Sequence, residues 1–274
     1  MLRFFETLDR RWLFLLMGLL VLLPLLFPLA LPLTVSPRVR SFHDAIARIP
    51  DRSTVLMPCD YDPSGIPEMV PMTKTALKQL FDKNCKVIVI CLWNGGAGLV
   101  DRVVRGVADE NHKVDGVDWV NLGFKEGREA VMVVMGQGIA NAFPKDYKGR
   151  DTRSLTIMRG VRDYSSFPIL VSISAGYPGT KEWVQQVQSR FHLPMVAGVT
   201  AVSAPEYYPY LQSGQLLGLL GGMAGAAEYE KIRGEKGTAT RGMDAQSMAH
   251  VFVALCILAG NWVHWRRRRG EAGS

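Results

Sequence analysis

Two aspartates, Asp60 and Asp62, follow the first apolar run in the central part of the chain, within the stretch PCDYDPSG. A carboxylate at the end of a buried strand can attack an electrophile, exchange a proton or bind Mg²⁺. Aspartates also form turns, because their side chains accept hydrogen bonds from the backbone two residues on. The pair is therefore the sharpest candidate for chemistry, but the interpretation that we adopt is that Asp60 caps a turn and Asp62 lies in a loop before Pro63.

An apolar strand that ends in Asp-x-Asp resembles the first motif of the haloacid dehalogenase superfamily. The resemblance implies that Asp60 attacks a phosphoryl group, that Asp62 acts as acid and base, and that magnesium binds beside them. It further implies roles for Lys125 and for Ser172 or Ser174, which end or follow later strands. No acidic pair follows a later strand to complete the family's metal site.

Further polar residues follow the other predicted strands, in WNGGAG, SAGYPGT and VSAPEYYP. Ligands of doubly wound sheets bind outside the carboxyl ends of the strands, where the strand order reverses. Glycines before a helix can also offer backbone N–H groups to an anion, although neither GxGxxG nor GxxxxGKS matches here. The predicted ligand-binding residues are Asp60, Asp62, Asn94, Gly95, Gly96, Ser174, Gly176, Tyr177 and Glu206.

Other common catalytic and metal patterns are missing from the sequence. There is no GxSxG nucleophile elbow, no CxxC pair and no His/Cys spacing typical of zinc. We therefore predict no cofactor, no metal and no catalytic residue, and keep Asp60, Asp62, Lys125 and Ser172 as the catalytic set of the phosphoryl-transfer alternative.

The elements that must position these loops alternate between strand and helix. Nearly continuous apolar runs such as CKVIVICLWN are typical of strands buried on both faces, and segments of helical period lie between them. The pattern predicts an α/β domain over residues 36–247 with a doubly wound, mostly parallel sheet of about five strands. The stretch RSLTIMRGVRDY is either a helix or an extended connector.

A glycine-rich stretch, QLLGLLGGMAGAAEYEK, suggests close packing. Gly218 and Gly222, and likewise Gly221 and Gly225, are four residues apart, so on a helix they form a smooth stripe. The stripe is predicted either to pack against the domain's own sheet or to form an interface with another subunit.

Two uncharged apolar stretches flank the domain. Leu13 to Val35 contains 23 residues, and Met248 to Trp265 ends in tryptophans followed by four arginines. A helix of roughly 20 apolar residues crosses a bilayer, so residues 1–35 and 248–274 are predicted to hold one transmembrane helix each. Pro24, Pro28 and Pro32 predict a straight first half and a kinked or unwound second half of the first span. A cleaved export signal and a buried core helix are the respective alternatives.

The charges indicate a membrane partner and no nucleic-acid partner. Seven of the 32 basic and three of the 25 acidic residues lie in the two ends, which leaves about +3 for residues 36–247. Arginines abut the outer end of each apolar stretch, which favours cytoplasmic termini and an extracytoplasmic domain. The sequence thus predicts a two-pass cell-membrane protein that binds a ligand or acts as a scaffold, as a homo-oligomer or with other membrane subunits. A magnesium-dependent phosphoryl-transfer hydrolase is the alternative.

Overall fold

The computed structural model describes residues 9–29 and 31–271 of the chain. Contacts divide it into two compact units, one of Met1–Leu33 with Thr240–Ser274 and one of Thr34–Ala239. The second unit holds the sheet and every predicted ligand-binding residue.

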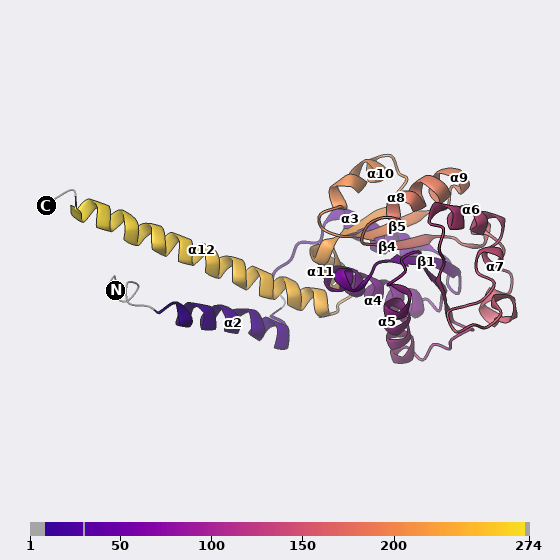
Figure 1. The fold of residues 1–274 in the computed structure, drawn as a ribbon, viewed down its shortest axis with the longest axis horizontal. Helices are drawn as coiled ribbons and strands as arrows, with labels where there is room; N and C mark the ends of the chain where they lie inside the picture. Colours follow the sequence, from indigo (N-terminus) through magenta and orange to yellow (C-terminus); the bar gives the residue numbers. More distant parts are fainter. Residues whose placement is uncertain (1–8, 30, 272–274) are drawn as a thin grey trace. The chain divides into compact units, whose positions relative to one another are not determined.

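A six-stranded parallel sheet forms the centre of the second unit (Figure 1). The strand order is β3-β2-β1-β4-β5-β6, the order of the Rossmann fold, so the chain is a Rossmann-like α/β protein. The strands are β1 (Thr54–Asp60), β2 (Lys86–Cys91), β3 (Trp119–Phe124), β4 (Leu170–Ser174), β5 (Met195–Val199) and β6 (Gly218–Gly221). The prediction of an α/β parallel sheet is confirmed, with one strand, β6, beyond the five expected.

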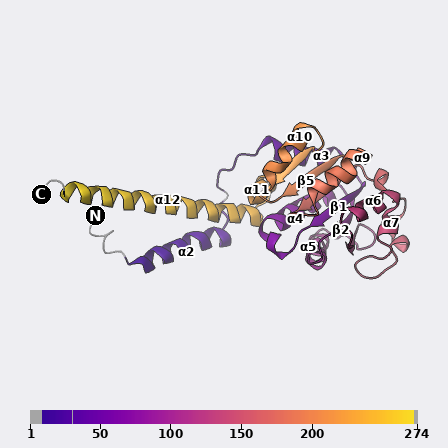
Figure 2. The same cartoon turned by 45° about the horizontal axis from the view of Figure 1, so that its top comes forward.

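Helices cover both faces of the sheet, as Figures 1 and 2 show. One face carries α3 (Pro37–Arg48), α4 (Ile66–Asp82), α5 (Ala97–Glu110) and α11 (Gly222–Ile232). The other carries α6 (Glu129–Gln137), α7 (Ile139–Ala142), the continuous segment α8 (Thr180–Trp183), η5 (Val184–Gln188) and α9 (Ser189–Phe191), and then η6 (Ala204–Tyr207) with α10 (Tyr208–Gln212). The remaining short turns are η1 (Pro63–Gly65), η2 (Thr152–Ser154), η3 (Thr156–Met158) and η4 (Tyr164–Ser166). RSLTIMRGVRDY is thus a connector of short 3₁₀ turns.

The strands form because their side chains are apolar on both faces of the sheet. Every residue of β4 and β5 is buried, and Val87 to Cys91 of β2 are buried as well. In β1 the pairing with β4 is interrupted between Leu56 and Cys59, at Pro58, which has no N–H to donate. Strand β1 therefore accommodates a proline, and its last residue, Asp60, lies at the carboxyl edge of the sheet.

The glycine-rich segment differs from its prediction as one helix. Gly218 and Gly221 lie in strand β6, and Gly222 and Gly225 lie at the start of α11. A Cβ on Gly218 would lie 2.2 Å from the Phe42 backbone nitrogen, which shows how closely α3 crosses β6. The prediction of a single helix is wrong because the spacing of these glycines reflects close approach of other segments of the same domain, not a helical period. The assembly interface predicted for them stays a prediction.

Two buried glutamates of α11 hold the ends of this unit. Glu228 accepts hydrogen bonds from the backbone N–H and the hydroxyl of Ser36, at 2.8 and 2.5 Å, just before α3. Glu230 accepts one from the N–H of Ala239, at 3.1 Å, in the first turn of α12 (Thr238–Glu271). One helix thus fixes both places where the domain joins the flanking segments.

The other unit consists of α2 (Arg10–Leu26) and α12. Among the described residues one helix, over Thr238–Trp265, is long and apolar enough to cross a membrane by length and composition. In the predicted first span, Leu13 to Val35, the helix α2 has only 17 residues and ends at Leu26. The backbone is extended at Phe27, and residues 28–29 and 31–36 have no regular secondary structure. The predicted two flanking transmembrane helices are therefore not both present as long helices. Residue 30 of the predicted first span, and residues 1–8 and 272–274 of the predicted end segments, lie outside the described residues.

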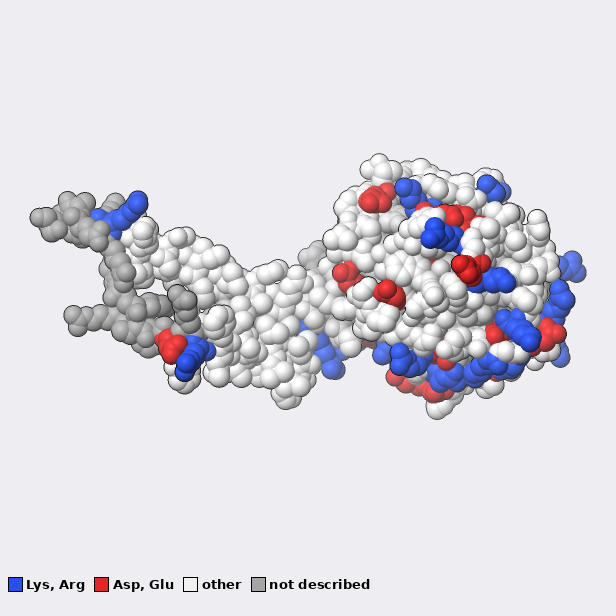
Figure 3. Space-filling model, viewed as in Figure 1, with Lys and Arg blue, Asp and Glu red and all other residues white. Residues whose placement is uncertain are grey.

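The surface of this helical unit differs from that of the domain (Figure 3). Its long helices show mostly uncharged surface, whereas Lys, Arg, Asp and Glu are mixed over the visible face of the α/β domain. Leu19, Leu22 and Leu258 are about half exposed or more, at 46, 50 and 65%. The described helices of this unit therefore leave large apolar side chains uncovered.

Candidate functional site

The order of the sheet reverses between β1 and β4. The chain builds β1, β2 and β3 outward in one direction and then returns to place β4 on the other side of β1. Ligands of open parallel sheets bind outside the carboxyl ends of the strands at this reversal. The loops after β1, β2, β3 and β4 meet at this edge.

Asp60 ends β1 and is completely buried. One carboxylate oxygen accepts the backbone N–H of Leu92 at 2.7 Å, and the other accepts the indole Nε1–H of Trp183 at 2.8 Å. Burial raises the pKa of Asp60 to about 7, against the two hydrogen bonds, which lower it. Because both oxygens are already bonded, Asp60 joins β1, β2 and α8, and a nucleophilic attack would require these elements to move.

Asp62 lies two residues further on and is partly exposed. Its Oδ1 accepts hydrogen bonds from the Ser64 backbone N–H at 2.9 Å and the Ser64 hydroxyl at 2.6 Å, and caps η1. These bonds hold the pKa of Asp62 below its ordinary value, so the side chain is a carboxylate at neutral pH. Asp62 thus lies in a loop before Pro63, as expected, but the expectation that Asp60 caps a turn is wrong, because the Asp60 side chain is bonded to Leu92 and Trp183 and Asp62 is the cap. A charged group therefore remains at the edge of the sheet.

The loop after β2 crosses over the end of β1 to reach the loop after β4. Trp93 donates its indole N–H to the carbonyl oxygen of Pro178 at 2.8 Å. A Cβ on Gly176 would lie 3.3 Å from the Trp93 ring, so glycine there leaves room for the indole. Arg128, after β3, lies over the ring of Tyr177 at 5.2 Å from its centroid. These contacts connect the loops after β2, β3 and β4 to one another.

A cavity of about 440 Å³ opens between these loops. We call it the switch pocket, and its lining is Asp62, Leu92, Trp93, Asn94, Gly95, Phe124, Glu126, Gly127, Arg128, Tyr177 and Pro178. Its volume lies within the range of small-molecule sites, roughly 300–1,000 Å³. It combines carboxylate acceptors, a guanidinium donor and aromatic faces.

The sequence-predicted residues divide into three groups around this pocket. Asp62, Asn94, Gly95 and Tyr177 line it. Other predicted residues support the same loops from beneath or beside it, namely Asp60, Gly96, Ser174 and Gly176. Glu206 lies apart from it, exposed in η6 after β5.

Sequence reasoning missed Trp93, Phe124, Glu126 and Arg128. Trp93, Glu126 and Arg128 follow the ends of β2 or β3, and Phe124 is the last residue of β3, so the rule that sites lie at strand ends could have found them. These four residues form no recognisable catalytic or binding motif in the sequence. That they line one cavity follows only from the structure.

The catalytic set of the alternative is not gathered at one point. Ser172 is buried and its hydroxyl is bonded to that of Thr180 at 2.9 Å, while Lys125 lines a different pocket. Within the described part of the chain, no group of three or more His, Cys, Asp or Glu is arranged to hold a metal ion. Burial also raises the pKa of the Cys91 thiol to about 12, so this thiol stays protonated at neutral pH.

The chain was compared with protein-family models, curated proteins and solved structures. No family model, no curated protein and no solved structure matches this chain.

Proposed function

We propose that this protein is a membrane-anchored binding protein whose Rossmann-like domain takes a small polar ligand in the switch pocket. The observation that carries the proposal is the meeting of four strand-end loops around one cavity at the reversal of the strand order. Cross-loop bonds such as Trp93 to Pro178 hold the cavity in shape before a ligand enters. Such preorganisation lowers the entropic cost of binding.

The lining favours a ligand that carries several hydrogen-bond donors and one flat face. Asp62 and Glu126 offer carboxylate acceptors, and Asn94 offers both a donor and an acceptor. The ring of Tyr177 is 55% exposed and offers a surface on which a ring can stack. Sugars and nucleosides have this combination of hydroxyl or amine donors on a compact ring.

The proposal is tested with the detergent-solubilised full chain and a panel of monosaccharides and nucleosides. Binding is measured as a shift in melting temperature and then as a Kd by calorimetry. Glu126→Gln removes one charged acceptor from the pocket, and hydrogen bonds to charged groups contribute about 1.5–3 kcal/mol. We therefore expect its Kd to rise about 10- to 100-fold.

Glu206→Gln is the matched control, because it removes the same charge from a strand-end loop outside the pocket. Its Kd should equal that of the unmodified chain. The absence of binding by every panel member, or equal Kd values for Glu126→Gln and the unmodified chain, would contradict the proposal.

The membrane part of the proposal is a two-pass anchor with both termini in the cytoplasm. It is supported by the apolar α12, by the uncharged stretch from Leu13 to Val35, and by arginines at the outer end of each. Protease added to intact spheroplasts should then digest residues 36–247. Digestion only after lysis would reverse the orientation. The glycine segment no longer supports assembly, since its close neighbours lie in the same domain, and a homo-oligomer is not part of this proposal.

A further inference from the structure

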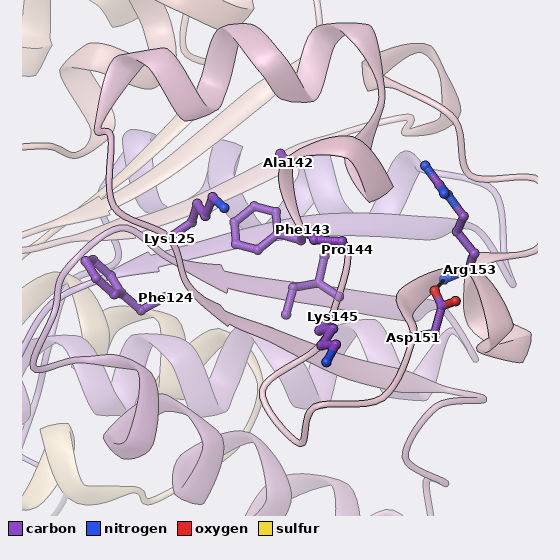
Figure 4. Close-up of a pocket in the computed structure, with 9 residues that line it drawn as sticks. Phe124, Lys125, Ala142, Phe143, Pro144, Lys145, Asp151 and Arg153 are labelled. Carbon is purple, nitrogen blue, oxygen red and sulfur yellow. Dashed lines mark hydrogen bonds between the residues drawn. The ribbon is translucent and has the colours of Figure 1, made fainter.

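A second cavity, of about 460 Å³, lies beyond the end of edge strand β3. We call it the basic pocket. Its walls come from the end of β3, the end of α7 and the loop that follows α7, and Figure 4 shows its lining residues. They are Leu122, Phe124, Lys125, Ala142, Phe143, Pro144, Lys145, Asp151 and Arg153.

The floor of the basic pocket is apolar. Leu122, Ala142 and Phe143 are each 2% exposed and belong to the core on this face of the sheet. Phe124 and Pro144 complete the wall with carbon atoms. A ligand that fills this floor needs an apolar body, because a polar group placed there would lose its hydrogen bonds to water.

The rim of the basic pocket carries three cations and one acid. Among the described residues, Lys125, Lys145 and Arg153 have no carboxylate within 4.0 Å of their charged nitrogens. Within the described part of the chain, the Arg153 guanidinium donates its one side-chain hydrogen bond to the neutral Asn141 side chain, at 3.1 Å. The acid, Asp151, accepts the Arg153 backbone N–H at 2.9 Å and caps η2.

The neighbouring cations of the same loop are arranged differently. Lys148 pairs with Asp115, and Arg150 pairs with Asp115 at 2.8 Å and with Asp146 at 2.6 Å. Asp146 also accepts the backbone N–H groups of Lys148 and Arg150, and Lys145 is bridged to Asp151 through the backbone. The loop is therefore fixed by its own acids, while the three rim cations are left without an anion.

We propose that the basic pocket binds a small organic anion, a phosphate or carboxylate group carried on a ring-sized apolar body. The anion would meet the rim cations and the body would cover the floor. In Figure 4 the Lys125 side chain extends beside the Phe143 ring, and Asp151 and Arg153 lie on the opposite side of the pocket. Exposed Lys and Arg side chains change rotamer easily, so the three cations can turn toward a bound anion. This site is separate from the switch pocket, with Phe124 as the wall residue common to both.

The test uses three probes on the detergent-solubilised full chain. Phenyl phosphate carries both the anion and the ring, inorganic phosphate carries the anion alone, and phenol carries the ring alone. Calorimetry should give a Kd for phenyl phosphate at least about tenfold below that of either partial probe, since each part adds its own contribution. Equal Kd values for phenyl phosphate and inorganic phosphate would overturn the proposal, as would no binding of phenyl phosphate at about 10 mM.

Surface variants identify the site. Combining Lys145→Gln with Arg153→Gln should raise the Kd for phenyl phosphate at least about tenfold, because charge-assisted bonds are lost while the exposed positions keep similar size. Arg102→Gln, on the exposed side of α5, removes a cation elsewhere and should leave the Kd unchanged. Ala142→Leu should abolish binding by filling the floor, and its melting temperature shows whether α7 stays folded. A double variant that binds like the unmodified chain would place phenyl phosphate elsewhere and refute the assignment.

Discussion

At the scale of single residues, Asp60 is the group that should make stability depend on pH. Its pKa is about 7 in the folded chain because of burial, whereas an unfolded Asp titrates at 3.8. Between these two pH values the folded state holds a proton that the unfolded state has released, so stability decreases as pH rises from about 4 to about 7. A shift of this size corresponds to a free-energy change on the order of 4 kcal/mol.

Asp60→Asn should remove this decrease, because the amide is neutral at every pH. The measurement is the urea midpoint of the full chain from pH 4 to 8, compared between the two proteins. Asp62→Asn is the control: the pKa of Asp62 is lowered, so its titration lies below this range. Parallel curves for the Asp60 variant and the unmodified chain would mean that Asp60 is ionised throughout.

Two adjacent glycines make a second test at this scale. Gly96 has φ −89°, which any residue adopts, but a Cβ there would lie 2.2 Å from the Tyr61 carbonyl oxygen. Gly96→Ala should therefore cost about 1–3 kcal/mol by overpacking. Gly95→Ala meets its nearest atom at 3.8 Å and should stay within about 0.5 kcal/mol. Urea unfolding of both variants checks the difference, and equal costs would show that the loop relaxes.

The position of Asp60 at a strand end was predictable, but its partners were not. The apolar run before it predicts a buried strand, and burial alone explains the direction of its pKa. Its bond to Trp183 joins residues 123 positions apart, and no local pattern predicts such a pairing. For the same reason the sequence named Asn94 and Tyr177 as site residues but gave no sign that Arg128 lies over the Tyr177 ring.

At the scale of elements, long apolar or periodic segments were predicted well and short ones were not. β1, β2, β3, β4 and β5 coincide with predicted strands because their runs are apolar on both faces. The stretch EGREAVMVVMGQGIANAF has the apolar period of a single helix, but it divides into α6 and α7 at Gly138, whose φ of 158° a helix cannot contain. Strand β6 has four residues, two of them glycines, so it lacks the side chains that signal a strand.

The junction of β6 and α11 gives a prediction at this scale. Gly222 has φ +61°, and a Cβ there would lie 2.5 Å from the Ala201 Cβ. Gly234 has φ +71° with no atom within 4 Å of such a Cβ. Gly222→Ala should cost the left-handed strain of about 1–2 kcal/mol plus overpacking of about 1–3 kcal/mol, whereas Gly234→Ala should cost the strain alone.

The readouts are urea unfolding and light scattering of the full chain in detergent. The Gly222 variant should be the less stable one, with the particle size unchanged, because Ala201 belongs to the same domain. A smaller particle without a loss of stability would instead locate Gly222 at a subunit interface.

At the scale of the whole molecule, the proposed two-pass anchor requires two segments that reach across a bilayer. The helix α2 has 17 residues, which at 1.5 Å per residue is about 25 Å, shorter than a hydrocarbon core of about 30 Å. Pro28 and Pro32 follow it and favour extended backbone in the residues before them, which agrees with the unwound second half predicted from the sequence. Extended backbone leaves polar groups unsatisfied in lipid unless other groups bond them. One such bond is present, from the Leu31 N–H to Asp244 at 3.0 Å.

Deletion of each end separately tests the two-pass anchor. The two-pass proposal predicts that a chain without residues 1–33 and a chain without residues 240–274 both stay in the membrane pellet after carbonate extraction. Each retains one apolar stretch, and burial of a stretch of that length holds a chain in the bilayer far more strongly than surface contacts do. The chain of residues 34–239 alone should appear in the supernatant, because its structure forms a compact unit without either stretch. Release of the chain that lacks residues 240–274 would show that α12 is the only span and that the segment containing α2 lies along the surface of the membrane or against another protein.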